Sequence, residues 1–154
     1  MNYIKTLEEL KFKIVENFKN NTLFSIRFLI ESYNGDDWKK YVRFTNDTYH
    51  KELVAAERSF DIYIISWKKN QQTKIHDHPN RGCLMKVLDG KIREDVYNNS
   101  NPPVLQRTNF LNIDDTGYRE GDLFLHKITP IFDSVSLHVY SPPGYKPKYY
   151  EIKN

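Results

Sequence analysis

The sequence has little cysteine, no long apolar run and no block of like charge. Its single cysteine, Cys83, cannot form an intramolecular disulfide framework, which is typical of proteins in a reducing compartment. The first ten residues carry Lys5, Glu8 and Glu9 where a signal peptide needs an apolar region, and no stretch is long enough to cross a membrane. We therefore predict a cytoplasmic protein without a membrane partner.

The sequence also has no large excess of positive or negative charge. The 23 basic and 20 acidic residues give a formal net charge of +3 and are spread along the whole length. This distribution argues against a nucleic-acid-binding arm or a polybasic anchor. A chain of 154 residues has the usual size of one domain, so we predict a single domain over residues 1–154, acting as a monomer with one site.

The first third of the chain has the spacing of amphipathic helices. Apolar residues recur three and four positions apart, first at Leu7, Leu10, Ile14 and Phe18 and again at Ile26, Leu29, Ile30 and Tyr33. Thr6 and Glu9 offer a capping box for the first helix, and we expect Asp36 or Asp37 to cap a short third helix. The segment 1–45 is thus predicted to be helical and to cover a core.

From about residue 49 the pattern changes to aromatic and β-branched runs separated by turn residues, which favours short antiparallel strands. The strand candidates are residues 60–67, 74–78, 83–88, 91–97, 122–128 and 135–140. Asp89-Gly90 suits a two-residue hairpin turn. Without an internal repeat, residues 49–154 must close on themselves or pack as a sandwich, and a small β-barrel with the helices packed against it is the simplest solution.

Three histidines stand out in the β region. His76 and His78 flank Asp77 on a predicted strand, so their side chains share a face and their Cα atoms lie roughly 7 Å apart. Two ligands, each about 2.1 Å from one ion, can bridge that gap. His126 follows Phe124 and Leu125, which are too apolar for a solvated face. Each histidine is therefore either a metal ligand or an ordinary residue of a polar strand face or of the core.

A resemblance to a known family enters at this point. The pattern His76-x-His78-x4-Cys83-x6-Gly90 resembles the first cupin motif, with cysteine where glutamate is usual, and this replacement is the mark of the cysteine dioxygenase family. Leu125-His126-Lys127 is similar to that family's third-ligand segment, and Ser136-Leu-His-Val-Tyr-Ser-Pro-Pro143 is similar to its closing strand. The likeness covers about residues 49–143. It implies a mainly β, cupin-type jelly roll that holds Fe(II) through His76, His78 and His126; a cupin that has lost its metal is the alternative.

The chemistry that the resemblance implies suits three neutral ligands. Imidazole binds Fe(II) well, and a site without a carboxylate keeps the full +2 charge, which favours a thiolate as the next ligand. The implied reaction joins a small thiol, cysteine in the first place, to O2 and places both oxygen atoms on sulfur as the sulfinate.

Residues near the expected metal carry further expectations from the resemblance. In animal-type members the residues matching Cys83 and Tyr140 are joined by a thioether, so the two are predicted to be able to crosslink. Ser136, His138 and Tyr140 alternate on one strand, and they are expected to form a hydrogen-bonded relay in the site. The alternatives are a buried thiol under a ring and a plain core histidine. By the same resemblance, Ser141-Pro142 is a candidate cis peptide.

The chain departs from the family at the residue that reads the substrate carboxylate. Members usually have Tyr-x-Arg one strand before the metal motif, whereas here Tyr49-His-Lys51 stands in register. We assign substrate binding to Tyr49, Lys51 and Ser136, and we expect lysine to be less selective because it lacks the planar fork of arginine.

Other cations offer alternatives to Lys51. Arg43 lies in a second Tyr-x-Arg segment, and Arg58 and Arg81 are further local cations, although solvated surface charges are the commoner fate of arginine. We assign His50 no role. Because only residues 144–154 follow the closing strand, we also expect a more open mouth to the site.

Three functions remain open from the sequence. The first is an Fe(II)-dependent cysteine dioxygenase. The second is a dioxygenase of another small thiol, such as 3-mercaptopropionate or cysteamine, which the lysine at position 51 keeps open. Cys83 favours cysteine, because relatives that use 3-mercaptopropionate commonly lack this cysteine. The third is a non-catalytic cupin that binds a metal or a small ligand.

Overall fold

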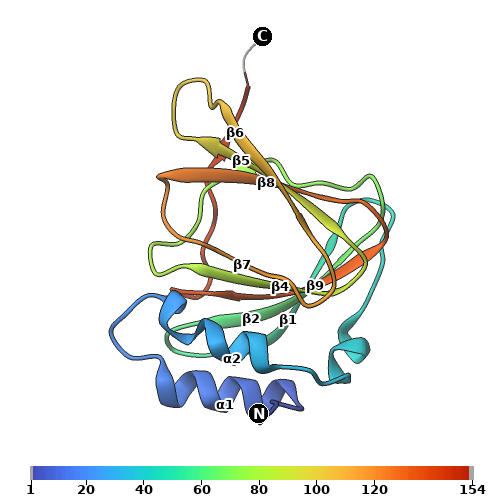
Figure 1. Ribbon diagram of the computed structural model, residues 1–154, viewed down its shortest axis with the longest axis vertical. Helices are drawn as coiled ribbons and strands as arrows, with labels where there is room; N and C mark the ends of the chain where they lie inside the picture. The colour runs from blue at the N-terminus through green and yellow to red at the C-terminus, as the bar shows by residue number, and fades with distance from the viewer. Residues whose placement is uncertain (1, 153–154) are drawn as a thin grey trace.

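The computed structural model describes residues 2–152 and places the N-terminal helices on the outside of one of two facing β-sheets (Figure 1). The helix α1 (Leu7–Asn17) begins at Thr6, whose side chain accepts a hydrogen bond from the backbone N–H of Glu9 at 3.1 Å. The reciprocal half of the predicted capping box is absent, because the Glu9 carboxylate accepts from the backbone of Lys5 at 3.4 Å. The apolar stripe through Leu10 and Ile14 is buried, as predicted.

The second predicted helix is split, and the third is a short 3-10 helix. The elements are η1 (Leu23–Ile26), α2 (Arg27–Ser32) and η2 (Asp37–Tyr41). The predicted cap of η2 is wrong: Asp36 makes no capping bond there, and the Asp37 carboxylate accepts from the backbone of Leu7 at 2.9 Å and from the Tyr33 hydroxyl at 2.6 Å. Asp37 therefore fastens the start of α1 to the end of α2.

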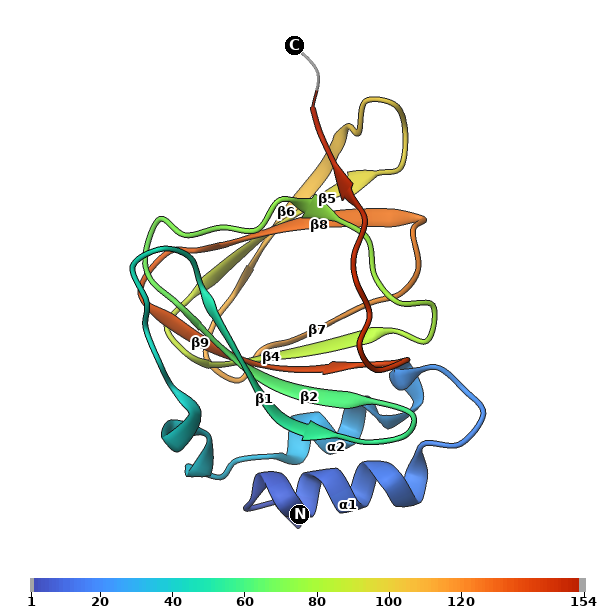
Figure 2. The ribbon, with the colours of Figure 1, turned by 180° about the vertical axis from the view of Figure 1, so that it is seen from behind.

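Within residues 2–152, ten strands form two antiparallel sheets of five. The strands are β1 (His50–Ala56), β2 (Asp61–Trp67), β3 (Ile75–His76), β4 (Cys83–Asp89), β5 (Ile92–Asn98), β6 (Leu105–Leu111), β7 (Thr116–Arg119), β8 (Phe124–Pro130), β9 (Ser134–Tyr140) and β10 (Tyr149–Tyr150). The first sheet has the order β1-β2-β9-β4-β7 and the second β10-β3-β8-β5-β6. Figures 1 and 2 show the two sheets facing each other, with α1 and α2 under the first.

The mainly β fold and all six predicted strands are confirmed, with two corrections. Over residues 2–152 the strand pairing does not join the two sheets into a closed barrel, so the fold is a two-sheet jelly roll with edges at β1, β7, β10 and β6. Four strands, β1, β6, β7 and β10, lie outside the six predicted candidates, and they are the edge strands of the two sheets. Edge strands give a weak signal; the side chains of β6, for example, are mostly exposed and show no apolar alternation.

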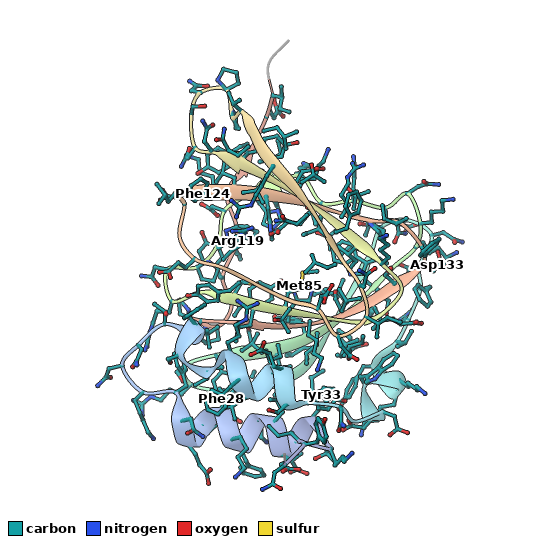
Figure 3. The ribbon with its side chains drawn as sticks, viewed as in Figure 1. Phe28, Tyr33, Met85, Arg119, Phe124 and Asp133 are labelled. Atoms are coloured by element: carbon teal, nitrogen blue, oxygen red, sulfur yellow. The ribbon has the colours of Figure 1, made fainter. Side chains whose placement is uncertain are left out.

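The central strands of the first sheet contribute side chains to two apolar clusters, because successive side chains of a strand point to opposite faces of the sheet. On the outer face, Ile62, Ile64, Leu84, Leu137 and Val139 pack against the helices. The inner faces of the two sheets share a second, smaller apolar cluster around Trp67 and Met85, and Met85 is seen between the sheets in Figure 3. The space between the sheets also receives the polar side chains of the same strands.

Within the described part of the chain, no helix has the length and apolar character needed to cross a membrane.

Candidate metal centre

The three predicted histidines converge between the sheets. His76 lies on β3 directly opposite His126 on β8, and His78 follows β3 by two residues. The ring centroids are 4.6 Å apart for His76 and His126, 4.3 Å for His78 and His126, and 5.5 Å for His76 and His78. One ring nitrogen from each residue lies within 4.8 Å of the others. The geometry thus brings together three donors that could share one ion.

Hydrogen bonds orient two of these rings so that Nε2 faces the centre. His76 Nδ1 donates to the Lys74 carbonyl at 2.8 Å, and His126 Nδ1 donates to the Glu94 carboxylate at 2.7 Å. The two Nε2 atoms are 3.1 Å apart. Two nitrogens that bind one ion at about 2.1 Å in adjacent positions have a similar separation, so this pair fits a metal.

His78 gives independent support for a metal ligand. Its side chain is buried, and neither ring nitrogen has a hydrogen-bond partner among residues 2–152. A buried polar atom without a partner costs about 1–3 kcal/mol, a cost that a metal bond removes. Burial, with the nearby His126, lowers the pKa of His76 to about 3 and holds the pKa of His78 well below its usual value. Both rings are therefore neutral near pH 7, as metal ligands must be.

The inner face of the first sheet brings a row of polar side chains beside the histidines. Asp61, Tyr140, Cys83 and Arg119 stand opposite one another in register across β2, β9, β4 and β7. Cys83 and Tyr140 are thus direct cross-strand neighbours, a relation in which side chains touch. Burial raises the pKa of the Cys83 thiol to about 12 and that of the Tyr140 phenol well above its usual value. Both groups are protonated near neutral pH.

A second set of inward side chains on β9 forms a connected chain of hydrogen bonds. Trp67 Nε1 donates to Ser136 Oγ at 2.9 Å, and Ser136 Oγ lies 2.7 Å from His138 Nε2. His138 Nδ1 lies 3.3 Å from the Tyr140 hydroxyl. Burial, followed by the charge of Lys51, holds the pKa of His138 well below its usual value, so this ring is also neutral. The strand alternation that the sequence indicated therefore brings these three residues into contact.

A cavity of about 190 Å³ opens beside the histidines. Its lining includes the three histidines, Cys83, His138, Tyr140, Tyr49, Lys51, Met85 and the tail residues Tyr145, Pro147 and Tyr149. The Lys51 ammonium lies 4.3 Å from the centroid of the Tyr63 ring and 4.5 Å from that of Tyr140, while the residue keeps solvent access. Tyr49 packs against Trp67, with 4.6 Å between ring centroids. Drug-sized ligands need about 300–1,000 Å³, so this cavity suits a smaller molecule.

The alternative cations do not line this cavity. The backbone of Arg43 donates to Ser66 Oγ, and the residue is exposed. The Arg81 guanidinium donates to the carbonyls of Lys19 and Asn21 and so holds the loop after α1. Arg58 is exposed and is absent from the cavity lining. Among these four cations, the structure brings only Lys51 to the histidines.

Several residues of the site were missed by sequence reasoning. Glu94 on β5 accepts hydrogen bonds from His126 and from Arg119. The one sequence signal for its role is the position of an acidic residue between Ile92 and Val96 on the same, buried face of the strand. The tail after β9 lines the cavity and runs from the first sheet to β10 at the edge of the second (Figure 2). The Tyr145 hydroxyl donates to Asp77, between the two first histidines, at 2.7 Å. The peptide bond Ser141-Pro142 is cis, as expected.

Comparisons with known proteins agree with this geometry. Human cysteine dioxygenase type 1 is 30% identical over 128 residues, which cover 77% of this chain and 64% of the human protein. The chain therefore spans a little less than two thirds of that relative's length. The zebrafish (Danio rerio) cysteine dioxygenase type 1 is 28% identical over 152 residues, covering 90% of this chain and 76% of that protein.

Solved structures show the fold, and a family model shows the relationship. A protein with a double-stranded β-helix domain from Klebsiella pneumoniae superposes with a TM-score of 0.61 at 16% identity, covering 75% of this chain and 89% of that one. This likeness concerns the fold alone. The model of the family described as cysteine dioxygenase type I matches residues 4–152, nearly the whole chain. The chain therefore belongs to the cysteine dioxygenase type I family.

Proposed function

We propose that this protein is an Fe(II)-dependent dioxygenase that converts cysteine and O2 into cysteine sulfinate. The observation that carries the proposal is the convergence of three histidines on a small cavity that Lys51 also lines, with His78 lacking a hydrogen-bond partner among residues 2–152. His76, His78 and His126 would hold the iron. When bound, ferrous iron would supply open coordination positions and unpaired electrons through which triplet O2 can react, while the four electrons that reduce O2 come from the substrate sulfur.

Lys51 would bind the substrate carboxylate. Its ammonium lies against the Tyr140 ring at the cavity, and Tyr140 is also next to Cys83 and His138. A substrate whose thiol lies at the histidines would thus present its carboxylate to Lys51 across a cavity fit for a few heavy atoms. Tyr49 and Trp67 would form the apolar wall that keeps this ion pair partly out of water.

The series of hydrogen bonds from Trp67 to Tyr140 would set the direction in which the Tyr140 hydroxyl donates its proton. Trp67 Nε1–H can only donate, so Ser136 Oγ accepts it and its own proton is directed to His138 Nε2. Neutral His138 then carries its proton on Nδ1 and donates it to the Tyr140 oxygen. This order leaves the Tyr140 O–H available to donate into the cavity, where it can orient substrate oxygen or sulfur.

Cys83 and Tyr140 are expected to form a thioether during turnover. The step joins sulfur to a ring carbon, breaks the S–H bond and one ring C–H bond, and passes the two protons and two electrons to O2, which is reduced to hydrogen peroxide. Intact mass spectrometry of protein incubated with Fe(II), cysteine and O2 should therefore show a species lighter by two hydrogens. The Cys83→Ser protein should keep its mass under the same treatment. An unchanged mass of the wild-type protein after many turnovers would contradict this expectation.

A second thiol remains a candidate because of Lys51. A flexible ammonium is less demanding than a guanidinium about the angle of the carboxylate, and 3-mercaptopropionate has the same carboxylate as cysteine without the amine. Cysteamine has the amine without the carboxylate, so it would make no use of Lys51. Oxidation of either thiol would agree with the metal centre and change only the assigned substrate.

A panel of these three thiols tests the proposal. Oxygen uptake and sulfinate formation are measured on protein whose iron content is determined in the same sample. We expect cysteine to give the highest kcat/KM, one sulfinate per O2, and cysteamine to give the lowest because it lacks a carboxylate for Lys51. No uptake with any thiol on fully iron-loaded protein would favour a non-catalytic metal-binding cupin.

We further propose that the protein acts as a cytoplasmic monomer without a nucleic-acid partner.

A further inference from the structure

A chain of polar contacts links the first sheet to the ligand His126 on the second. Arg119 on β7 donates from Nε to Glu94 Oε2 at 2.9 Å and from Nη2 to Glu94 Oε1 at 3.0 Å. His126 Nδ1 donates to Glu94 Oε2 at 2.7 Å, and Asn109 Nδ2 on β6 donates to Glu94 Oε1 at 3.0 Å. Each carboxylate oxygen therefore accepts two hydrogen bonds. Figure 3 shows Arg119 in the space between the two sheets.

The strand register explains why these residues meet. Glu94 and His126 lie on neighbouring strands, β5 and β8, as diagonal neighbours on one face, since Glu94 is opposite Ile128 and His126 is opposite Val96. Arg119 stands opposite Cys83 on the facing sheet. Glu94 and His126 are buried, and the side chain of Arg119 is only 19% exposed. A buried carboxylate without partners is costly, so the bidentate guanidinium is what allows Glu94 to remain charged beside the histidine.

The charge of Glu94 is well defined. Its two oxygens accept four hydrogen bonds, two of them from the Arg119 guanidinium, which is the set of partners that an ionised carboxylate takes. An ionised carboxylate that accepts the Nδ1 proton makes Nε2 a stronger donor to a metal. A guanidinium that binds the same carboxylate neutralises part of its negative charge, so the carboxylate increases the basicity of Nε2 less.

We propose that Glu94 is a positioning residue that keeps His126 in the Nδ1-protonated tautomer, and that Arg119 limits the charge Glu94 passes to the ring. The inference rests on the metal centre of the proposed function and is independent of the thiol. A more basic Nε2 would stabilise ferric iron more than ferrous iron, because the ferric ion has the higher charge. By keeping Nε2 less basic, Arg119 favours the ferrous state. Arg119 thus sets the redox poise of the centre from the opposite sheet.

The first test removes the carboxylate together with its guanidinium. In the double variant Glu94→Leu/Arg119→Met, both partners become apolar groups of similar size, a change that folded proteins tolerate better than the loss of one partner. In metal-free protein, the 15N shifts of the His126 ring should change from one Nδ1-protonated tautomer to a mixture. The Kd for Co(II), used alone as the probe, should rise about 10–100-fold.

Asp95→Asn is the matched control on the same strand. Asp95 faces the other side of β5, where it accepts from Thr108 Oγ1 at 2.7 Å and lies 3.3 Å from Arg93. Its loss of charge should leave the His126 tautomer unchanged and the Co(II) Kd within twofold of wild type. The positioning role is overturned when the double variant behaves like this control in both measurements.

The second test keeps Glu94 and removes only the charge of Arg119. Arg119→Gln retains a hydrogen-bond donor, and the Fe(III)/Fe(II) midpoint potential of the iron-loaded protein should move to a lower value. An unchanged or higher potential would overturn the role of Arg119. Wild-type protein that binds no Co(II) would instead contradict the metal centre itself, while the tautomer of metal-free His126 would still decide the role of Glu94.

Discussion

Replacing His78 with leucine is expected to reduce thiol-dependent oxygen uptake to the background level and to abolish stoichiometric iron binding. His78 is the proposed ligand whose two ring nitrogens have no hydrogen-bond partner among residues 2–152, and a metal is the group that would use them. Loss of one of three histidines leaves two donors, too few to hold a ferrous ion with three open positions. Iron content by metal analysis and oxygen uptake with cysteine are the measurements.

The stability of the same variant provides a readout that does not depend on activity. Leucine removes a buried polar ring that makes no hydrogen bond, so the metal-free variant should have a Tm equal to or above that of metal-free wild type. Only wild type should gain stability when Fe(II) is added anaerobically, since a ligand stabilises the state that binds it. A variant that still gains Tm with Fe(II) would show that His78 is not a ligand.

His50→Ala is the matched control for His78. His50 is half-buried, lies 3.1 Å from Glu52 on the same strand and is absent from the cavity lining. Its replacement should leave iron content and oxygen uptake unchanged. Equal losses in the two variants would indicate general damage to the sheet rather than loss of a ligand.

Replacing Lys51 with methionine is expected to raise KM for cysteine about 10–100-fold, with a smaller change in kcat. A hydrogen bond to a charged group contributes about 1.5–3 kcal/mol, and each 1.36 kcal/mol corresponds to a factor of ten. Methionine keeps a flexible apolar stem beside the Tyr63 and Tyr140 rings and removes the ammonium group, with its charge and its hydrogen-bond donors. Steady-state oxygen uptake over a range of cysteine concentrations separates KM from kcat.

The thiol panel makes this prediction specific to the carboxylate. The KM for 3-mercaptopropionate should rise with that for cysteine, whereas kinetics with cysteamine should stay as in wild type, because cysteamine has no carboxylate. Lys51→Arg should keep or lower the KM for cysteine, since the guanidinium offers two parallel donors to a carboxylate. An equal effect of Lys51→Met on cysteine and cysteamine would exclude Lys51 as the carboxylate anchor.

Lys91→Met is the matched control for this lysine. The Lys91 ammonium also lies over an aromatic ring, 5.4 Å from the centroid of Phe110, and the residue does not line the cavity. It should change neither KM nor kcat for any of the three thiols. A rise in KM in this control would point to a long-range effect of surface charge.

Features set by the spacing of residues along one segment could be predicted from the sequence. The stripe through Leu10 and Ile14 is buried as the helical period requires, and Ser136, His138 and Tyr140 touch because side chains on a strand alternate. The pair His76 and His78 follows from the same alternation. These relations depend only on the local backbone, which the sequence determines through its apolar period and turn residues.

Features that depend on which strands lie side by side were decided by the tertiary structure. Nothing in the local pattern indicated that Arg119 would cross from one sheet to Glu94 on the other, or that Lys51 would lie over Tyr63 and Tyr140. Strand register and the facing of two sheets set these contacts, because residues far apart in the chain become neighbours only when the shared core is buried. Local spacing along the chain was enough to indicate the three histidines, whereas the packing of the two sheets set the side chains that surround them.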